Sequence, residues 1–230
     1  MNRTENPTRT DRGSRIFTAA VLALLGALIL AAIIVPIGVF RSRGEVMISC
    51  GSVTVRRDLY LFWLSAYKYD YLSEQIRDGI DATDTPEYWY GTTTAGVTRA
   101  SYVREKADVW IKRVVFAAAF YEEDDRTLGD RTLAELQGAC DRLLQYELNT
   151  ERAYNEAAKT IGFTFSAVRR AFFYQFEGEA FLSAMDDDEF AAFCALADSE
   201  VTLSGAAEKI DLVALKTDRR LYDPAFLPKE

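Results

Sequence analysis

The chain has 230 residues, of which 35 are acidic, 27 are basic and none is histidine. Histidine is the commonest general base and the commonest metal ligand, so its absence excludes Ser-His-Asp and Cys-His mechanisms. The net charge of −8 disfavours binding to nucleic acid and to anionic lipid headgroups. We therefore expect no nucleic-acid partner.

The 25 residues between Ile16 and Phe40 carry no charged side chain. As a helix rising ~1.5 Å per residue they would cover ~37 Å, enough to cross a ~30 Å hydrocarbon core. The run is longer than the apolar region of a secretory signal peptide, so we expect an uncleaved transmembrane helix that contacts the lipid bilayer. Residues 47–51 also resemble a lipoprotein cleavage box, which leaves lipidation of Cys50 as an alternative.

The charges that flank this apolar run predict its orientation. Four arginines precede it, whereas only Arg41 and Arg43 follow it closely. Because basic residues accumulate on the cytoplasmic side of a membrane helix, we expect residues 1–15 to be a disordered cytoplasmic tail. The main domain would then lie outside the cytoplasm of a single-pass cell-membrane protein, in a bacterial envelope. That part is acidic, with 33 acidic and 23 basic residues after residue 40.

The chain after the apolar run reads as one mainly helical domain over residues 45–200. Two β-branched runs, at residues 46–49 and 53–55, surround a Cys-Gly-Ser sequence suited to a tight turn, which predicts a short strand and turn at its start. Helical spacing of apolar residues then recurs in six segments, at residues 56–78, 99–123, 132–144, 150–160, 166–185 and 186–196. Thr132 and Glu135 form a capping-box pattern for the third segment.

Two further segments lack a helical period. Residues 79–98 are rich in Gly, Thr and Asp, which predicts a long loop with Tyr88, Trp89 and Tyr90 at its middle. Residues 201–230 form a C-terminal extension, in which the apolar runs 201–203 and 210–215 flank a Gly-containing stretch and are compatible with a small β-hairpin.

No residue pattern indicates catalysis or a bound cofactor. Cys50, Cys140 and Cys194 are far apart and match neither a CxxC pattern nor a dense disulfide framework, so three small buried apolar residues are favoured over one disulfide plus a free thiol. The acidic runs at residues 122–125 and 186–189 lack the EF-hand pattern, and helix capping is favoured over calcium binding. We expect no catalytic residue, no metal and no cofactor. An enzyme that uses carboxylates alone is the remaining alternative.

Aromatic side chains are more crowded than one buried helix face can hold, with six of them between residues 60 and 71. Exposed aromatic residues bordered by charge are typical of interaction surfaces. We therefore predict a polypeptide-binding surface, the alternative being that each of these residues packs in the interior. The predicted contact residues are Tyr67, Tyr71, Tyr88, Trp89, Tyr90, Phe173 and Tyr174.

Three segments together carry a resemblance to a known family. They are VMISCGSVTVRRDL at residues 46–59, the helices at residues 103–121 and after Thr132, and residues 151–185 with Ile-Gly-Phe before Ser166. In this order they resemble the SurA/PrsA-type extracytoplasmic chaperones. The resemblance implies a SurA N-terminal-like domain that cradles unfolded secreted or envelope proteins. The family's parvulin domain has no counterpart here, because only 45 residues follow Met185 and none is histidine, so prolyl isomerase activity is not implied.

We therefore expect a membrane-anchored, extracytoplasmic chaperone-like protein that binds unfolded or nascent secreted and envelope polypeptides by non-covalent contact. The alternative is a bitopic scaffold whose exposed aromatic residues dock one folded partner in an envelope, secretion or division assembly.

Overall fold

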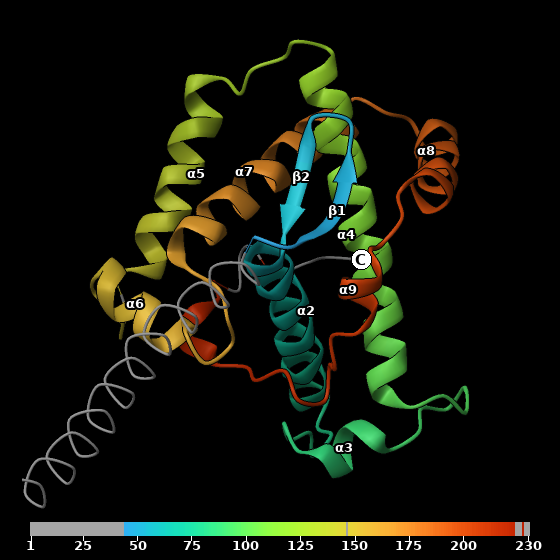
Figure 1. Cartoon of the computed structure of the whole chain (residues 1–230), viewed down its shortest axis with the longest axis vertical. Helices are drawn as coiled ribbons and strands as arrows, with labels where there is room; N and C mark the ends of the chain where they lie inside the picture. The colour runs from blue at the N-terminus through green and yellow to red at the C-terminus, as the bar shows by residue number, and fades with distance from the viewer. Residues whose placement is uncertain (1–43, 146, 224–226, 228–230) are drawn as a thin grey trace, which may run out of the picture. The chain divides into compact units, whose positions relative to one another are not determined.

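The computed structural model describes residues 44–145, 147–223 and 227. These residues form eight α-helices, one 3-10 helix and a two-stranded sheet, which confirms the predicted mainly helical class (Figure 1). The predicted tail at residues 1–15 and the predicted transmembrane helix at residues 16–40 lie outside the described ranges. Among the helices that are described, none combines the length and the hydropathy needed to cross a bilayer.

The described chain opens with an antiparallel hairpin of β1 (Val46–Cys50) and β2 (Val53–Arg56), which confirms the predicted strand and turn and adds a second strand before the first long helix. The turn requires Gly51, whose φ of 53° lies in the left-handed region. Ile48 and its cross-strand partner Val55 are buried, whereas the neighbouring Ser49 is exposed, so one face of the hairpin packs on the core while the other faces solvent.

The helices begin where the sequence supplies polar caps. They are α2 (Arg57–Arg77), α3 (Pro86–Tyr90), α4 (Arg99–Glu123), α5 (Asp130–Leu143), α6 (Glu151–Ala158), α7 (Phe165–Leu182), α8 (Asp187–Glu200), α9 (Gly205–Glu208) and the 3-10 helix η1 (Arg219–Leu221). The side chains of Thr98, Thr150 and Thr164 each accept a hydrogen bond from the first turn of the helix that follows. At α8, Asp186 and Glu189 form a reciprocal capping box, which confirms the capping role predicted for this acidic run.

Two predictions about the helices are wrong, one on where a helix begins and one on a segment expected to be a loop. The pattern at Thr132 and Glu135 does not cap α5, which begins two residues earlier after Gly129 without a side-chain cap. Glu135 instead accepts a hydrogen bond from Arg131 within the helix, at 3.0 Å. The predicted loop at residues 79–98 contains α3, which starts with Pro86 at its first position and Thr85 as its N-cap. A helix of five residues is too short to give an apolar period.

The central helix is α4. Its closest packing is against α7, and it also contacts α2, α8 and both strands (Figure 1). Ala117 is fully buried, and Gly178 on α7 faces it so closely that an added Cβ would lie 3.4 Å from the Cβ of Ala117. Small residues on both helices therefore bring α4 and α7 together.

The predicted C-terminal hairpin is not formed. Gly205–Glu208 is the short helix α9, capped by Ser204, and no strand follows it among the described residues. The guanidinium of Arg104 donates to the carbonyl oxygens of Ala207 and Ile210, at 2.7 Å each, and so occupies acceptors that a pairing strand would need.

The segment after α9 belongs to the same core as the helices. It runs past α2 (Figure 1) and contributes Leu212, Leu215 and Leu221, all nearly inaccessible to solvent. The hydroxyl of Tyr154 on α6 donates to the carbonyl oxygen of Leu221 at 2.7 Å. The ring of Tyr222 lies between those of Phe62 and Tyr69, with centroid distances of 6.2 and 5.0 Å.

All three cysteines are free thiols, as favoured from the sequence. Cys140 and Cys194 are buried, whereas Cys50 on β1 is half-buried. Burial raises the pKa of the thiols of Cys50 and Cys140. Both thiols are therefore protonated at neutral pH and behave as small apolar groups.

Candidate polypeptide-binding site

A groove of about 630 Å³ lies between α4, α7 and α8. Its volume is in the range typical of ligand-binding clefts, about 300 to 1,000 Å³. Trp110 and Val114 line it from α4, Leu182 lines it from α7, and Phe190 lines it from α8. The lining is therefore apolar over three separate helices, and we refer to it below as the α4–α7–α8 groove.

The indole of Trp110 packs against a buried aromatic residue of the core. Its ring meets that of Trp63 edge-on, with centroids 5.9 Å apart, and Trp63 is 1% exposed. The indole nitrogen of Trp63 donates to the side-chain oxygen of Gln175, at 3.4 Å, and Gln175 also lines the groove. Trp110 is thus a half-buried aromatic surface on a rigid support.

Charged side chains border the groove. Arg113 of α4 and Asp198 of α8 form an ion pair of 3.5 Å across it, and Lys112 donates to the carbonyl oxygen of Asp198 at 3.4 Å. The lining also includes Glu105 and Glu179. The Arg113–Asp198 pair is partly exposed to solvent, at 35% and 43%, so it contributes little to stability.

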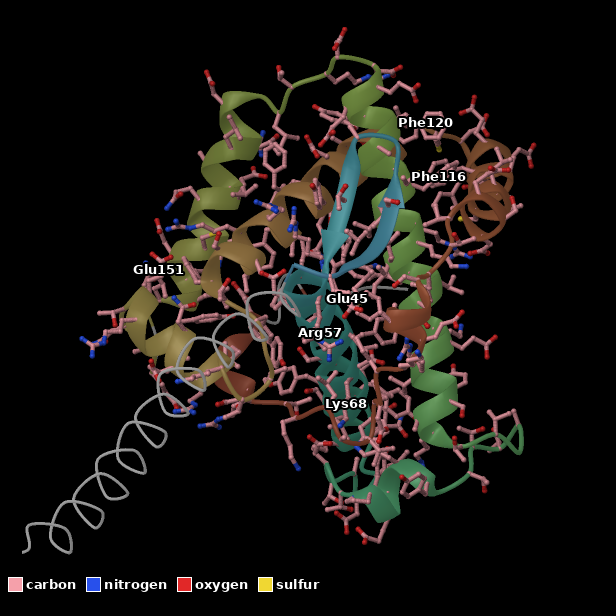
Figure 2. All side chains as sticks on the ribbon, in the orientation of Figure 1. Glu45, Arg57, Lys68, Phe116, Phe120 and Glu151 are labelled. Atoms are coloured by element: carbon pink, nitrogen blue, oxygen red, sulfur yellow. The ribbon has the colours of Figure 1, made fainter. Side chains whose placement is uncertain are left out.

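Helix α8 is attached to α4 through aromatic rings. Phe193 is buried, with its ring 5.1 Å from Phe116 and 5.8 Å from Phe181. Phe116 and Phe120 project from α4 toward α8 (Figure 2). In its first turn α8 exposes Phe190 at 44%, on the same face as Phe193, and on another face it exposes Leu196 at 52%. Only one side of this helix is therefore covered by the described chain.

The seven aromatic residues predicted to contact a polypeptide do not form one surface. They divide among the groove (Tyr67), the surroundings of α3 (Tyr71, Tyr88, Trp89 and Tyr90) and the outer part of α7 (Phe173 and Tyr174). Of these residues only Tyr67 lines the groove.

Two of the seven are buried, contrary to the prediction that they lie on the surface. Tyr67 is 8% exposed because α2 is covered on several sides, by α4, by α7 and by the C-terminal segment. Trp89 is fully buried, with Tyr71 packed 6.1 Å from its ring. By contrast, Tyr90 is 62% exposed and Phe173 is 36% exposed.

Lys68 is a buried lysine whose environment the sequence does not reveal (Figure 2). Its Nζ lies 2.7 Å from Oδ1 of Asp84, donates to the carbonyl oxygen of Leu215 and sits 4.8 Å from the ring centre of Trp89. Burial lowers the pKa of Lys68. The hydrogen-bond partners satisfy the ammonium group, so this cluster has a structural role in joining α2, α3 and the C-terminal segment.

Asp84 is the centre of the same cluster. Its Oδ1 accepts from the indole nitrogen of Trp89 at 2.8 Å, and its Oδ2 accepts from the hydroxyl of Thr217 at 2.9 Å. Burial raises the pKa of Asp84, but the hydrogen bonds from Lys68 and Trp89 outweigh burial and leave the pKa below its usual value. The carboxylate is therefore charged at neutral pH.

Glu177 is a second buried charged residue, on α7 beside the groove residue Gly178. It is 4% exposed, and within the described chain its Oε2 has no hydrogen-bond partner. Burial raises the pKa of Glu177 to about 7, with a further contribution from the negative charge of Glu122 on α4. Glu122 itself accepts a hydrogen bond from the hydroxyl of Ser52.

No group of three or more cysteine, aspartate or glutamate side chains in the described ranges is placed to hold a metal ion. No protein-family model, curated protein or solved structure matches this chain.

Sequence reasoning missed most of the groove. Trp110 has the spacing of an inward-facing residue, yet its side chain is half-buried and lines the groove. Phe190 gives no signal of exposure either, because it continues the stripe of α8 that Phe193 and Ala197 define. Leu196 falls off this stripe, so α8 also carries an apolar residue outside its buried face.

Proposed function

We propose that the domain binds polypeptide segments with exposed apolar side chains in the α4–α7–α8 groove, as a chaperone-like protein anchored in a membrane by residues 16–40. The observation that carries the proposal is the apolar lining by Trp110, Leu182 and Phe190 in a groove of about 630 Å³. Leu227, from the C-terminal end of the same chain, also lines this groove. A leucine side chain on a polypeptide is thus compatible with the site.

The energetics fit weak, reversible binding. Burying one large apolar side chain contributes about 1.5 to 3 kcal/mol, so a segment with two such side chains would bind without any covalent step. The negative charge of the domain favours segments that also carry Lys or Arg. No nucleotide site is needed, because release would follow from weak affinity and from folding of the bound chain.

The sequence supports the same reading. The predicted anchor would hold the groove beside a membrane from which secreted chains emerge, and the SurA/PrsA-type resemblance implies binding of unfolded secreted or envelope proteins. The runner-up is a scaffold that docks one folded partner, which the exposed Tyr90 favours.

Two matched substitutions on α8 test the proposal. Phe190 lines the groove at 44% exposure, whereas Leu196 is 52% exposed and is not part of the lining. The full chain in lipid nanodiscs would be titrated against a fluorescent, reduced and permanently unfolded client, and binding followed by anisotropy. We expect Phe190→Ser to weaken binding at least fivefold and Leu196→Ser to leave it unchanged. No binding by the parent chain at micromolar concentration would refute the proposal.

A further inference from the structure

Exposed apolar side chains gather at one end of the domain, away from the groove. They are Ile76 at 59%, Ile80 at 45%, Tyr90 at 62% and Val97 at 44% exposure. Ile76 lies in the last turn of α2, Tyr90 ends α3, and the other two lie in the connections before α3 and α4. These segments lie together at the lower end of the domain in Figure 1. We call these four residues the apolar tip.

The part of the tip that carries Tyr90 is held in place by contacts of its neighbours in α3. Trp89, next to Tyr90, is fully buried and bonded to Asp84, which Lys68 anchors to α2. On the other side, Arg99 at the start of α4 donates to the carbonyl oxygen of Tyr88 at 3.2 Å, and its guanidinium lies 4.7 Å from the ring centre of Tyr88. A surface fixed in this way loses little conformational entropy on binding.

Negative charge borders the tip. Asp78, Asp81 and Glu87 are exposed in the same segments, and the described residues provide none of them with an ion-pair partner. The basic residue Arg77 is paired with Glu74 at 3.4 Å. An acidic border is repelled by anionic lipid headgroups, so the tip does not suit a membrane surface, and it is complementary to a basic one.

The tip also lies far from the start of the described chain. The backbone nitrogen of Arg57 donates to the carbonyl oxygen of Glu45 at 2.9 Å, so the chain enters beside the first turn of α2. The 21 residues of α2, at ~1.5 Å each, place Ile76 ~30 Å away. The groove lining includes none of the four tip residues, so the two surfaces are distinct.

We propose that the apolar tip docks a folded protein that presents an apolar patch bordered by Lys and Arg. The four side chains are 44% to 62% exposed and line no groove of the described chain, so they do not enclose an extended chain, whereas they fit a recess on a folded surface. Tyr90 is the central contact, because aromatic residues at the core of an interface contribute most of the binding energy. The acidic border disfavours a second copy of this chain as the partner. This surface would recruit one partner while the groove serves unfolded chains.

Site-specific photo-crosslinking identifies the partner, and binding to it tests the proposal. A photoreactive phenylalanine analogue would replace Tyr90 in the full chain in native membranes, with Phe190 as the matched groove position. We expect one discrete adduct from position 90 that position 190 does not give. The purified folded partner should then bind the parent chain saturably. It should bind the Tyr90→Asp variant at least tenfold less tightly. Binding to the parent should weaken as salt is raised, and Phe190→Ser should leave it unchanged.

Three outcomes would overturn this inference and leave the groove proposal unaffected. They are the absence of a discrete adduct at position 90, salt-independent binding that Tyr90→Asp does not alter, and binding of anionic lipid vesicles that Tyr90→Asp abolishes. Failure of the groove proposal is separate, because it is read from Phe190→Ser and an unfolded client. An unchanged melting temperature of Tyr90→Asp controls for misfolding, since the side chain is largely exposed.

Discussion

Lys68 and Asp84 form an ion pair of 2.7 Å in which the lysine side chain is fully buried and the aspartate side chain is 24% exposed. Sixteen residues separate them, and the pair joins the middle of α2 to the segment that leads into α3. Trp89 and Thr217 also donate hydrogen bonds to the carboxylate of Asp84. This one carboxylate therefore links α2, α3 and the C-terminal segment.

Removing the acid of this pair is predicted to be costly. Asp84→Ala leaves the Lys68 ammonium buried without its counter-charge, and breaking buried pairs in this way costs about 3 to 5 kcal/mol. Lys68→Met should cost less, because Asp84 keeps the hydrogen bonds from Trp89 and Thr217 and has some access to water. Chemical denaturation of both single variants and of the double variant measures these changes in the free energy of unfolding. Equal effects of the two single substitutions would contradict the assignment of Asp84 as the centre of the cluster.

The stability of the domain should depend on pH through Glu177. Its pKa in the folded chain is about 7, above the ordinary value of 4.5, with burial as the main cause and Glu122 as the second. A raised pKa of an acid means that its full contribution to stability is present below pH 4.5 and is lost as pH rises through about 7. The loss is on the order of 3 kcal/mol when complete.

Glu177→Gln keeps the shape of the neutral acid and removes this dependence. We expect the variant to unfold at a higher temperature than the parent at pH 8 and at about the same temperature at pH 4.5. Glu122→Gln removes the neighbouring negative charge and should give a smaller gain in the same direction at pH 8. A parent and a Glu177→Gln variant with parallel melting curves across this pH range would show that Glu177 is not buried as described.

Gly162 should tolerate no side chain. Its φ is 105°, and an added Cβ would lie 3.0 Å from Cδ1 of Leu61. Gly162→Ala is therefore expected to destabilise the domain by about 1 to 3 kcal/mol. Gly129 is the matched control, because its φ is −67° and nothing lies within 4 Å of the added Cβ. Thermal unfolding of both variants measures the difference. A Gly129→Ala variant as unstable as Gly162→Ala would show that the positive φ of Gly162 is not the cause of the instability.

Much of the fold could be predicted from the sequence because its signals are local. The bounds of α4 follow from Thr98 as N-cap and from an apolar period that runs for 25 residues. The first strand and its turn follow from the β-branched runs around Gly51, whereas the second strand is not predicted. Local patterns fail where a tertiary contact decides the outcome. The segment after Ser204 has β-branched residues, but Arg104 binds its carbonyl oxygens and it forms a helix and an irregular strap instead.

The candidate site was less accessible to sequence reasoning. The sequence does not distinguish Tyr67 from Trp89, since both are aromatic residues in aromatic-rich segments. In the structure Tyr67 lines the groove, whereas Trp89 lies in the interior beside Lys68. Whether an aromatic ring is exposed depends on the elements that fold over it from distant parts of the chain. The groove itself is a gap between three helices, and no segment of the sequence encodes it alone.

The most direct test of the central claim is to map where an unfolded client contacts the domain. A photoreactive phenylalanine analogue would replace Leu182, which lines the groove on α7, and in a second variant Leu133, which is 41% exposed on α5 and does not line it. Each full-chain variant would be irradiated with the same unfolded, reduced client. We expect adducts at position 182 that excess unlabelled client suppresses, and none above background at position 133. Equal adducts at both positions, or none at position 182, would contradict the central claim.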